Sequence, residues 1–437
     1  MKNRYDRYKD SGIAWIGEIP EHWEVRTLKT MLSGLQDGTH GTFENIISNY
    51  LLLSAKNITD NGLQFSDLER TISENDYKAI VSNGYPQKGD ILLCCVGTIG
   101  RCCIYNYDKI YAFQRSVSFL RTNKNESNSF LLYLLRSQIC TTQFLMLART
   151  SAQSGIYLST LANLIIVTPS LFEQQSIAAY LDQKCGEIDE LITLQEEMIT
   201  KLQSYKQSVI TEAVTKGLDK NVPLKDSGIE WIGEIPEHWN VRTLKTMLSG
   251  LQDGTHGTFE NIVSNYLLLS AKNITDNGLQ FSDLERTISE NDYKAIVSNG
   301  YPQKGDILLC CVGTIGRCCI YNYDKIYAFQ RSVSFLRTNK NESNRFLLYV
   351  LRSQICTTQF LMLARTSAQS GIYLNSLANL IVVTSPLSEQ QSIADYLDKK
   401  CSEIDELISI KQQKIEKLKE YKKSLIFECV TGKRKVS

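Results

Sequence analysis

The sequence has no run of about 18 consecutive apolar residues, the length that a membrane-spanning helix requires. The first ten residues, MKNRYDRYKD, are polar and lack the apolar core of a signal peptide. No sign of charge dominates, because 48 Lys and Arg face 47 Asp and Glu, for a net charge of +1. We therefore expect a cytoplasmic, globular protein without a membrane partner, and not a strongly basic one.

The motifs of common catalytic sites are also missing. The segment GTIGR at 97–101 lacks the spacing of a phosphate-binding loop. No Asn-Pro pair occurs, so the sequence lacks the Asn-Pro-Pro-aromatic motif of adenine methyltransferases. DYK at 76–78 is the nearest match to a nuclease site, but it falls on a predicted surface helix. Four histidines are too few for a metal cluster without cysteine ligands. We expect no catalytic residue, no cofactor site and no metal site in this chain.

Cysteine is plentiful, with 13 residues, and eight of them form close pairs. Disulfides are not expected in a protein without an export signal. A zinc site is one interpretation, but the spacing differs from the usual C-x₂₋₄-C of zinc ligands. The other interpretation, which we favour, is that they are small buried apolar residues in a hairpin. The paired cysteines are Cys94, Cys95, Cys102, Cys103, Cys310, Cys311, Cys318 and Cys319.

The main feature of the chain is an internal repeat. The segment DSGIAWIGEIPEHW at 10–23 returns at 226–239 with one change. A shift of 216 aligns residues 10–190 with 226–406 without a gap. This period is too long for the repeat of a solenoid protein. Each copy is long enough to form its own core. The 14 positions that differ, in the numbering of the first copy, are 14, 24, 47, 129, 134, 159, 160, 166, 169, 170, 172, 179, 183 and 186.

The agreement ends where each copy enters a helical tail. Between 191–215 and 407–431, 13 of 25 positions differ. The first tail predicts a short helix that starts with a capping box at Ser170 and ends near Lys184, then a long helix over 187–215. The equivalent helix over 403–431 is the expected partner of that apolar seam. The residues expected to form the seam are Ile188, Ile192, Ile199, Leu202, Tyr205 and Val209.

Patterns within one copy predict a mixture of strands and helices. Strands are expected at 50–55, in a hairpin over 91–105, at 111–119 and at 164–167, and helices at 74–81 and 130–148. The fold class is therefore α+β. The domain boundaries that we expect are 1–170 and 221–386 for two globular domains, with 171–220 and 387–437 as helical regions.

Three motifs, repeated in order, carry a resemblance to a known family. They are DSGIAWIGEIPEHW before each body, GDILL and GTIGR within it, and EQQSIAAYLDQKCGEIDELI with AVTKGL at its end (EQQSIADYLDKKCSEIDELI with CVTGKR in copy two). The chain resembles the specificity subunit of type I restriction–modification enzymes over essentially its whole length. The resemblance implies two target-recognition domains related by a pseudo-twofold axis, separated by two long antiparallel coiled-coil helices.

The resemblance also implies the partners. Each domain would bind one half of a split site in double-stranded DNA, and the helices would serve as spacer and platform for two methyltransferase subunits. S-adenosylmethionine would be carried by those subunits, and ATP and Mg by restriction (motor) subunits. This subunit would itself be non-catalytic. Two other classes stay open, a freestanding DNA-binding regulator and a coiled-coil adaptor that does not recognise DNA.

Loop residues with side chains suited to base edges or phosphates are the candidates for DNA contact. For each of them, an ordinary surface or capping role is the alternative. None is among the 14 differing positions, so two equal domains predict equal half-sites, in inverted order if the helices pair antiparallel. The candidates are Asp37, Thr39, His40, Lys56, Asn57, Arg101, Gln114, Arg115, Ser151, Gln153 and Ser154, with their copies Asp253, Thr255, His256, Lys272, Asn273, Arg317, Gln330, Arg331, Ser367, Gln369 and Ser370.

Overall fold

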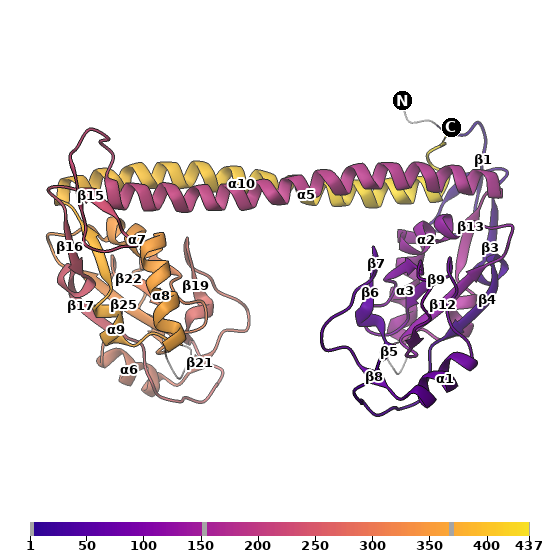
Figure 1. Cartoon of the computed structure of the whole chain (residues 1–437), viewed down its shortest axis with the longest axis horizontal. Helices are drawn as coiled ribbons and strands as arrows, with labels where there is room; N and C mark the ends of the chain where they lie inside the picture. Colours follow the sequence, from indigo (N-terminus) through magenta and orange to yellow (C-terminus); the bar gives the residue numbers. More distant parts are fainter. Residues whose placement is uncertain (1–3, 151–154, 367–370, 437) are drawn as a thin grey trace. The chain divides into compact units, whose positions relative to one another are not determined.

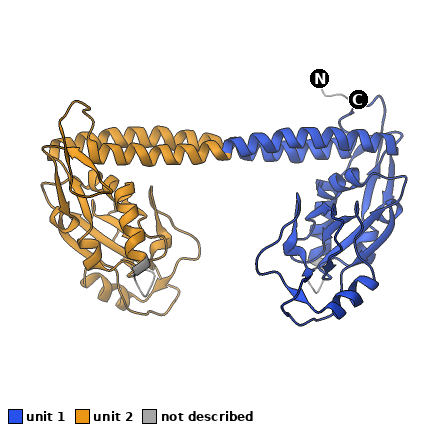
Figure 2. Cartoon of the chain, in the orientation of Figure 1, with its two compact units in different colours: residues 1–195, 413–437 blue, residues 196–412 orange. Residues whose placement is uncertain are grey.

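The computed structural model describes residues 4–150, 155–366 and 371–436. The chain forms two compact units, one of residues 1–195 with 413–437 and one of residues 196–412 (Figure 2). Each unit contains one copy of the repeated body and a part of both long helices (Figure 1). The unit boundaries therefore fall inside the helices. The α+β class is confirmed, since each body mixes sheets and helices.

The first body and its long helix contain eighteen labelled elements. They are β1 (Tyr8–Asp10), β2 (Glu18–Pro20), β3 (Glu24–Thr27), β4 (Leu32–Asp37), β5 (Tyr50–Leu53), β6 (Ile58–Thr59), β7 (Gly62–Leu63), β8 (Thr71–Ile72), α1 (Glu74–Ser82), β9 (Ile91–Cys94), β10 (Cys102–Ile104), β11 (Ala112–Phe113), β12 (Val117–Thr122), α2 (Asn128–Arg136), α3 (Gln138–Thr150), α4 (Leu158–Ala162), β13 (Ile165–Thr168) and α5 (Leu171–Lys216).

The second body repeats this order. Its elements are β14 (Leu224–Asp226), β15 (Glu234–Pro236), β16 (Asn240–Thr243), β17 (Leu248–Asp253), β18 (Tyr266–Leu269), β19 (Ile274–Thr275), β20 (Gly278–Leu279), β21 (Thr287–Ile288), α6 (Glu290–Ser298), β22 (Ile307–Cys310), β23 (Cys318–Ile320), β24 (Ala328–Phe329), β25 (Val333–Thr338), α7 (Asn344–Arg352), α8 (Gln354–Thr366), α9 (Leu374–Ala378), β26 (Ile381–Thr384) and α10 (Leu387–Val430).

Two sheets organise each body. In the first body an antiparallel sheet has the order β10-β9-β12-β4, and a second has the order β11-β5-β8, with β11 parallel to β5. The hairpin expected over 91–105 is confirmed as β9 and β10. The single strand expected at 111–119 is wrong, because a turn at 114–116 separates β11 from β12. The backbone of Gln114 pairs with Thr39 there, and Val117 N donates to Gln114 O at 3.0 Å to close the turn.

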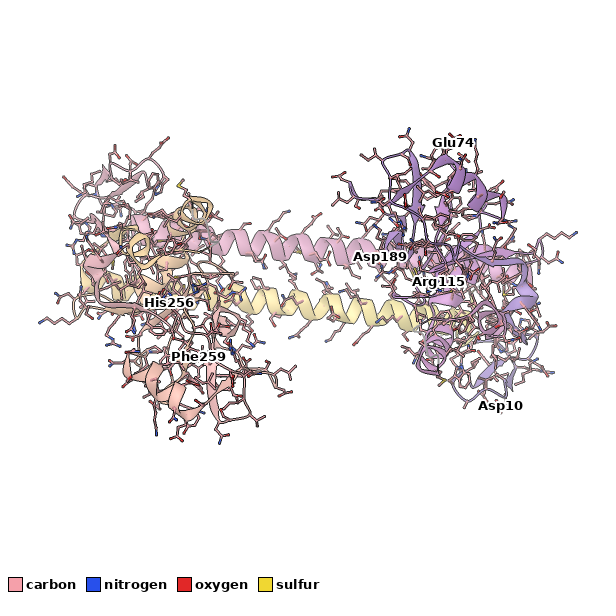
Figure 3. The ribbon with its side chains drawn as sticks, turned by 90° about the horizontal axis from the view of Figure 1, so that it is seen from below. Asp10, Glu74, Arg115, Asp189, His256 and Phe259 are labelled. Atoms are coloured by element: carbon pink, nitrogen blue, oxygen red, sulfur yellow. The ribbon has the colours of Figure 1, made fainter. Side chains whose placement is uncertain are left out.

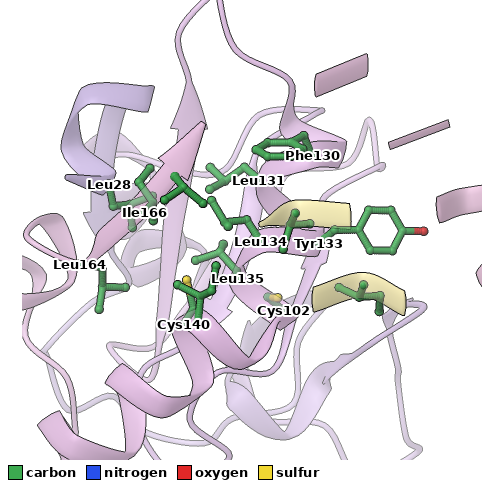
Figure 4. Close-up of a cluster of buried hydrophobic side chains, with 14 of the residues drawn as sticks. Leu28, Cys102, Phe130, Leu131, Tyr133, Leu134, Leu135, Cys140, Leu164 and Ile166 are labelled. Atoms are coloured by element: carbon green, nitrogen blue, oxygen red, sulfur yellow. The ribbon is translucent and has the colours of Figure 1, made fainter. Parts of the chain in front are cut away.

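The largest core of the first body lies between its sheet, α2, α3 and the long helices (Figure 4). Phe130, Leu134 and Ile166 are fully buried in it, beside the thiols of Cys102 and Cys140. The single helix expected at 130–148 is wrong. Buried Ser137 has extended backbone and caps the end of α2, donating from its hydroxyl to Leu134 O at 2.6 Å, so α3 begins a new direction bent by 58°. No single helix of the described ranges is long and apolar enough for a membrane span; α2 with α3, and α7 with α8, meet the length and composition test only as bent pairs.

The long helix α5 is continuous from Leu171 to Lys216, so the break expected between Lys184 and Glu187 is wrong. Cys185 and Ile188, on either side of Gly186, are buried in the same core as the end of α10. This packing stabilises the helical conformation at the glycine. The capping box at its start is half formed. Ser170 Oγ accepts from Glu173 N at 3.4 Å, but the Glu173 carboxylate turns away from the Ser170 backbone, toward the aromatic side chains of the opening segment.

The two long helices pair antiparallel inside each unit. In the first unit, Lys422 of α10 binds Asp189 of α5 at 2.6 Å; in the second, Lys206 of α5 binds Asp405 of α10 at 2.7 Å. Adding 216 to 189 gives 405, and adding 216 to 206 gives 422, so the two ion pairs are the same contact with the helices exchanged. The expected seam is confirmed at Ile188 and Val209, which are buried. Tyr205 is 57% exposed and does not belong to the seam.

The repeated opening segment packs against the end of a long helix in both units. In the second unit, Gly217 follows α5 directly and lies against the ring of Trp239. A Cβ at Gly217 would be 3.2 Å from the nearest atom of that ring. In the first unit the end of α10 takes this place: Lys433 Nζ donates to Ile16 O at 2.7 Å, and Tyr8 donates to Gly432 O at 3.0 Å. Each unit thus has one copy of the segment in contact with a helix end.

Candidate nucleic-acid interface

Three loops of the first unit meet where β4, β5 and β11 end. Thr39 N donates to Phe113 O at 2.7 Å, Arg115 N donates to Thr39 O at 2.9 Å, and Gln114 N donates to Leu53 O at 2.8 Å. These backbone bonds join the loop after β4, the loop after β5 and the turn between β11 and β12. The structure thus brings Asp37, Thr39, His40, Lys56, Gln114 and Arg115 to one edge of the body, and the second unit repeats the same bonds.

Gly38 makes this approach possible. A Cβ at Gly38 would lie 2.3 Å from Phe113 O and 2.4 Å from Gln114 O, and at Gly254 the same two contacts would measure 2.3 Å. Backbone atoms cannot give way as a flexible side chain can, so only glycine fits. Gly38 is a functional residue that the candidates from the sequence do not include, although its place between Asp37 and Thr39 could have indicated it.

Arg115 and Arg331 are the most available cations of the edge. Both are exposed, and within the described ranges no hydrogen bond or ion pair of either guanidinium is found (Figure 3 labels Arg115). Arg115 interrupts an otherwise apolar strand face in the sequence, which is compatible with a paired interior residue or with a residue at the mouth of a strand. The turn places it at the strand mouth. A free guanidinium is the group that binds guanine edges or phosphates in bidentate fashion.

The other candidate cations have partners. Lys56 Nζ lies 3.0 Å from a Glu69 carboxylate oxygen, and Arg101 Nη1 donates to Ile58 O at 3.3 Å. The Lys56 side chain is still 55% exposed, so its ammonium can contact a phosphate without a change in the loop backbone. His40 is paired with Asp37, at 2.8 Å between Nε2 and Oδ2, and His256 with Asp253 at 2.9 Å. The carboxylate side of that pair is a potential acceptor for cytosine N4.

Asn57 supports its loop instead of presenting its amide. It is 1% exposed; its Oδ1 accepts from Ser54 N at 2.9 Å, and its Nδ2 donates to Gln64 O at 3.1 Å. Asn273 repeats both bonds. Because both ends of the amide are occupied, Asn57 and Asn273 are structural residues of the loop and not proposed DNA contacts.

Six candidates lie outside the described residues. The nearest described residue to the first three, Gly155, forms a bridge with Val96, and Ile156 N donates to Cys95 O at 2.9 Å. Residues 155–156 therefore join the loop after β9, next to Arg101. The candidates concerned are Ser151, Gln153, Ser154, Ser367, Gln369 and Ser370.

The cysteines show no chemistry at this edge. All 13 are buried, which confirms their interpretation as small apolar residues of the core. Burial raises the pKa of the Cys102 and Cys103 thiols to about 12, so neither is a reactive thiolate at neutral pH. Among the described residues, no group of three or more His, Cys, Asp or Glu side chains could hold a metal ion.

Comparison with known proteins identifies relatives of the whole chain. The family model described as "Type I restriction modification DNA specificity domain" matches residues 41–203 and 262–420. A putative type I restriction enzyme MjaX specificity subunit of Methanocaldococcus jannaschii is 27% identical over 96% of both chains. The type I restriction enzyme MjaVIII specificity subunit of the same organism is 28% identical over 63% of each.

A solved structure shows the same fold. This structure comes from a study of complex assembly and conformational transition of the type I R-M system. Its chain superimposes with a TM-score of 0.68 at 15% sequence identity, over 95% of this chain and 99% of that one. The family model covers most of both repeats, and each match contains the part of the loop edge that Lys56, Gln114 and Arg115 or their copies form. The chain therefore belongs to the type I restriction–modification DNA specificity family.

Proposed function

We propose that this chain is the DNA-recognition subunit of a type I restriction–modification enzyme, in which each unit binds one half of a split site. The observation that carries the proposal is the loop edge built around Thr39, Gln114 and the exposed guanidinium of Arg115, present once per unit. Backbone bonds hold these loops in place, so the backbone that carries their side chains is ordered before DNA arrives.

The two half-sites have the same base sequence. None of the 14 differences between the copies falls on a candidate residue, and both units make the same loop contacts. The half-sites run in inverted order, because the antiparallel helix pair exchanges the roles of α5 and α10 between the units. Equal contact residues in inverted order bind an interrupted palindrome.

The paired helices are the platform for the catalytic partners. Leu191 (42% exposed) and Leu194 (51%) of α5 stand out from the helix pair in the first unit, and Leu407 (47%) and Ile410 (50%) of α10 do so in the second. These residues occupy equivalent positions of the repeat, so each unit presents an equivalent apolar pair, with isoleucine in place of one leucine in the second unit. We propose one methyltransferase subunit on each, carrying S-adenosylmethionine to methylate adenine, with restriction subunits that use ATP and Mg joining that complex.

The experiment is methylome sequencing of cells with and without this gene. The expected result is the loss of one methylated adenine motif made of two equal, inverted halves around a spacer. Substitution of Arg115 and Arg331 together should abolish or relax the same motif. A purified chain that binds one sequence tightly while methylation is unchanged would instead indicate a regulator, and a chain without DNA affinity would indicate an adaptor.

A further inference from the structure

We propose that a groove of the second unit binds a segment of one methyltransferase subunit that carries an aromatic ring and a cation, so that the chain holds its two methyltransferase subunits unequally. The inference rests on the proposed function, because it deepens the role of the helix pair as a platform. The groove runs along α5 from Gln203 to Lys216 and has a volume of about 810 Å³. Trp231 and Ile232 of the opening segment and Ile355 of α8 also line it.

The end of α10 provides a ring and a cation at the corresponding place of the first unit. Phe427 of α10 is the counterpart of Thr211. Its side chain packs on the core that contains Ile16, which is the counterpart of Ile232. The Lys433 ammonium lies 5.6 Å from the centre of the Phe427 ring and donates to Ile16 O at 2.7 Å. A ring with its cation thus closes the first unit between the helix end and the opening segment.

The second unit lacks this ring. Thr211 stands in the position of Phe427, and its hydroxyl is already bonded, because it accepts from Gln354 N at 3.0 Å and donates to Gln207 O at 2.9 Å. The groove beside it is open, and the Trp231 side chain in its wall is 47% exposed. An indole that faces an open groove is a surface against which the aromatic ring of a partner can pack.

The second unit also lacks the cation. Gly217 follows α5 with a φ of 73°, and Gly432 follows α10 with a φ of 69°, so the two helix ends turn in the same way. Lysine and arginine follow Gly432, whereas Leu218 and an aspartate follow Gly217. Among the described residues, no donor to Ile232 O is found, although its counterpart in the first unit accepts from Lys433. A carbonyl is therefore left for the cation of a partner.

A carboxylate without an ion pair gives the groove its charge. Glu212 lines the groove and is exposed, and within the described ranges no ion pair of its carboxylate is found. Its counterpart Glu428 pairs with Arg434, at 3.2 Å between Oε2 and Nε. Lys216 also lines the groove, but it forms no ion pair with Glu212. The groove thus suits a basic segment, which supplies the charge that Lys433 and Arg434 supply in the first unit.

The groove adjoins the proposed platform, which identifies the methyltransferase subunit as the occupant. Lys206 of α5 pairs with Asp405 of α10 at 2.7 Å. Gln203 lies three residues before Lys206, and Leu407 lies two residues after Asp405, so in antiparallel helices these positions are level to within one turn. A protein that covers Leu407 and Ile410 can therefore reach the groove. Because the first unit fills the same place with its own residues, only one of the two methyltransferase subunits gains this contact.

The test titrates the full chain with the purified methyltransferase subunit and follows the complexes by native mass spectrometry. The expected result is two dissociation constants that differ by about tenfold or more, because a buried ring with its cation strengthens one site only. Glu212→Lys should weaken the tighter site to the level of the other, since like charges would then meet. Thr211→Phe, which copies the first unit, should have the same effect. Two equal constants in the wild type, or unequal constants that neither variant changes, would overturn the proposal.

Phe172→Ser is the matched control, because Phe172 is an aromatic residue outside the groove, is 79% exposed, and has serine as its counterpart at position 388. It should leave both constants unchanged. Melting curves of all three variants show whether a lost contact reflects unfolding; Glu212→Lys changes an exposed side chain and should melt like the wild type.

Photo-cross-linking identifies the occupant in the complex expressed with both kinds of partner subunit. With p-benzoylphenylalanine in place of Trp231, the cross-link should join one methyltransferase segment that contains an aromatic residue and Lys or Arg. A cross-link to a restriction subunit or to a second copy of this chain, or none at all, would overturn the proposal while leaving the proposed function intact. A wild-type chain that binds no methyltransferase subunit would overturn the proposed function itself.

Discussion

Lys422 of α10 donates hydrogen bonds to both carboxylate oxygens of Asp189 on α5, at 2.7 and 2.6 Å. The second unit repeats this bidentate contact with Lys206 and Asp405, at 2.7 Å to each oxygen. The pairs lie beside the apolar seam and fix the register of the antiparallel helices, although both are partly exposed and therefore individually weak.

Charge reversal should test this register. Asp189→Lys and Lys422→Asp should each lower the free energy of unfolding by about 1 kcal/mol, because each leaves two like charges in contact. The double variant should recover most of that loss. Thermal melts of the three variants measure it, and the same swap at Lys206 and Asp405 is the matched control in the other unit. A double variant no more stable than the singles would contradict a direct pairwise contact.

Arg115 and Arg331 should be equivalent in recognition. Because both guanidinium groups are exposed on identical turns, Arg115→Ala and Arg331→Ala should each cost about 1–3 kcal/mol of specific binding and relax one position of one half-site. Methylation motifs and melting curves measure the two effects separately. Conservative Arg→Lys variants should keep phosphate affinity but lose bidentate base contact. Unfolding of either alanine variant, with the motif unchanged, would show a structural role.

Glu69 should make stability depend on acid pH. Burial alone would raise the pKa of its carboxyl, but hydrogen bonds from Asn57, Lys56 and Ser66 outweigh burial and lower the pKa to about 2, from an ordinary value of 4.5; the pKa of Glu285 is lowered likewise. A lowered folded-state pKa stabilises the protein above the ordinary value, and this contribution is lost as the pH falls from about 4.5 to about 2.

The double variant Glu69→Gln, Glu285→Gln should therefore have a free energy of unfolding about 1–3 kcal/mol lower than the wild type at neutral pH. Its free energy of unfolding should also fall less steeply between pH 4.5 and 2. Denaturation followed at a series of pH values gives both quantities. Equal pH dependence in wild type and variant would show that these carboxyl groups have ordinary pKa values.

Gly38→Ala should damage recognition more than its size suggests. The added Cβ would overlap Phe113 O and Gln114 O, so the loop after β4 must move away from Arg115, with a cost of about 1–3 kcal/mol in stability and loss of specific binding. Gly186→Ala is the control, since a Cβ there meets no atom within 4 Å inside α5. That change should stabilise the protein by about 1 kcal/mol. Unaltered DNA binding in Gly38→Ala would separate the glycine from the interface.

The sequence predicted the repeat, the β9–β10 hairpin and the helix pair, because these follow from self-similarity and apolar periodicity. It did not predict the continuity of α5 through Gly186, since only the packing of Cys185 and Ile188 in the core that also contains the end of α10 compensates for a glycine. Periodicity also put Tyr205 in the seam, although that ring is exposed. Asn57 had the side chain of a base reader, but it completes a capping box with Ser54 and bonds to Gln64, both nearby in sequence, so the Ser-x-x-Asn pattern could have indicated its structural role.

The end of α10 should stabilise the opening segment of the first unit alone. Lys433 donates to Ile16 O at 2.7 Å, and burial lowers the pKa of its ammonium, so Lys433→Ala removes a bond that water cannot fully replace. Hydrogen exchange should then quicken over 8–23 by several-fold, because the segment opens locally more often. Residues 224–239 of the second unit are the internal control, since they pack on the end of α5, and their exchange should not change. Tyr8→Phe, which removes the bond to Gly432 O, should produce a smaller change in the same direction. Equal exchange over 8–23 in wild type and Lys433→Ala would show that the segment is held by its apolar contacts with Trp23 and not by the helix end.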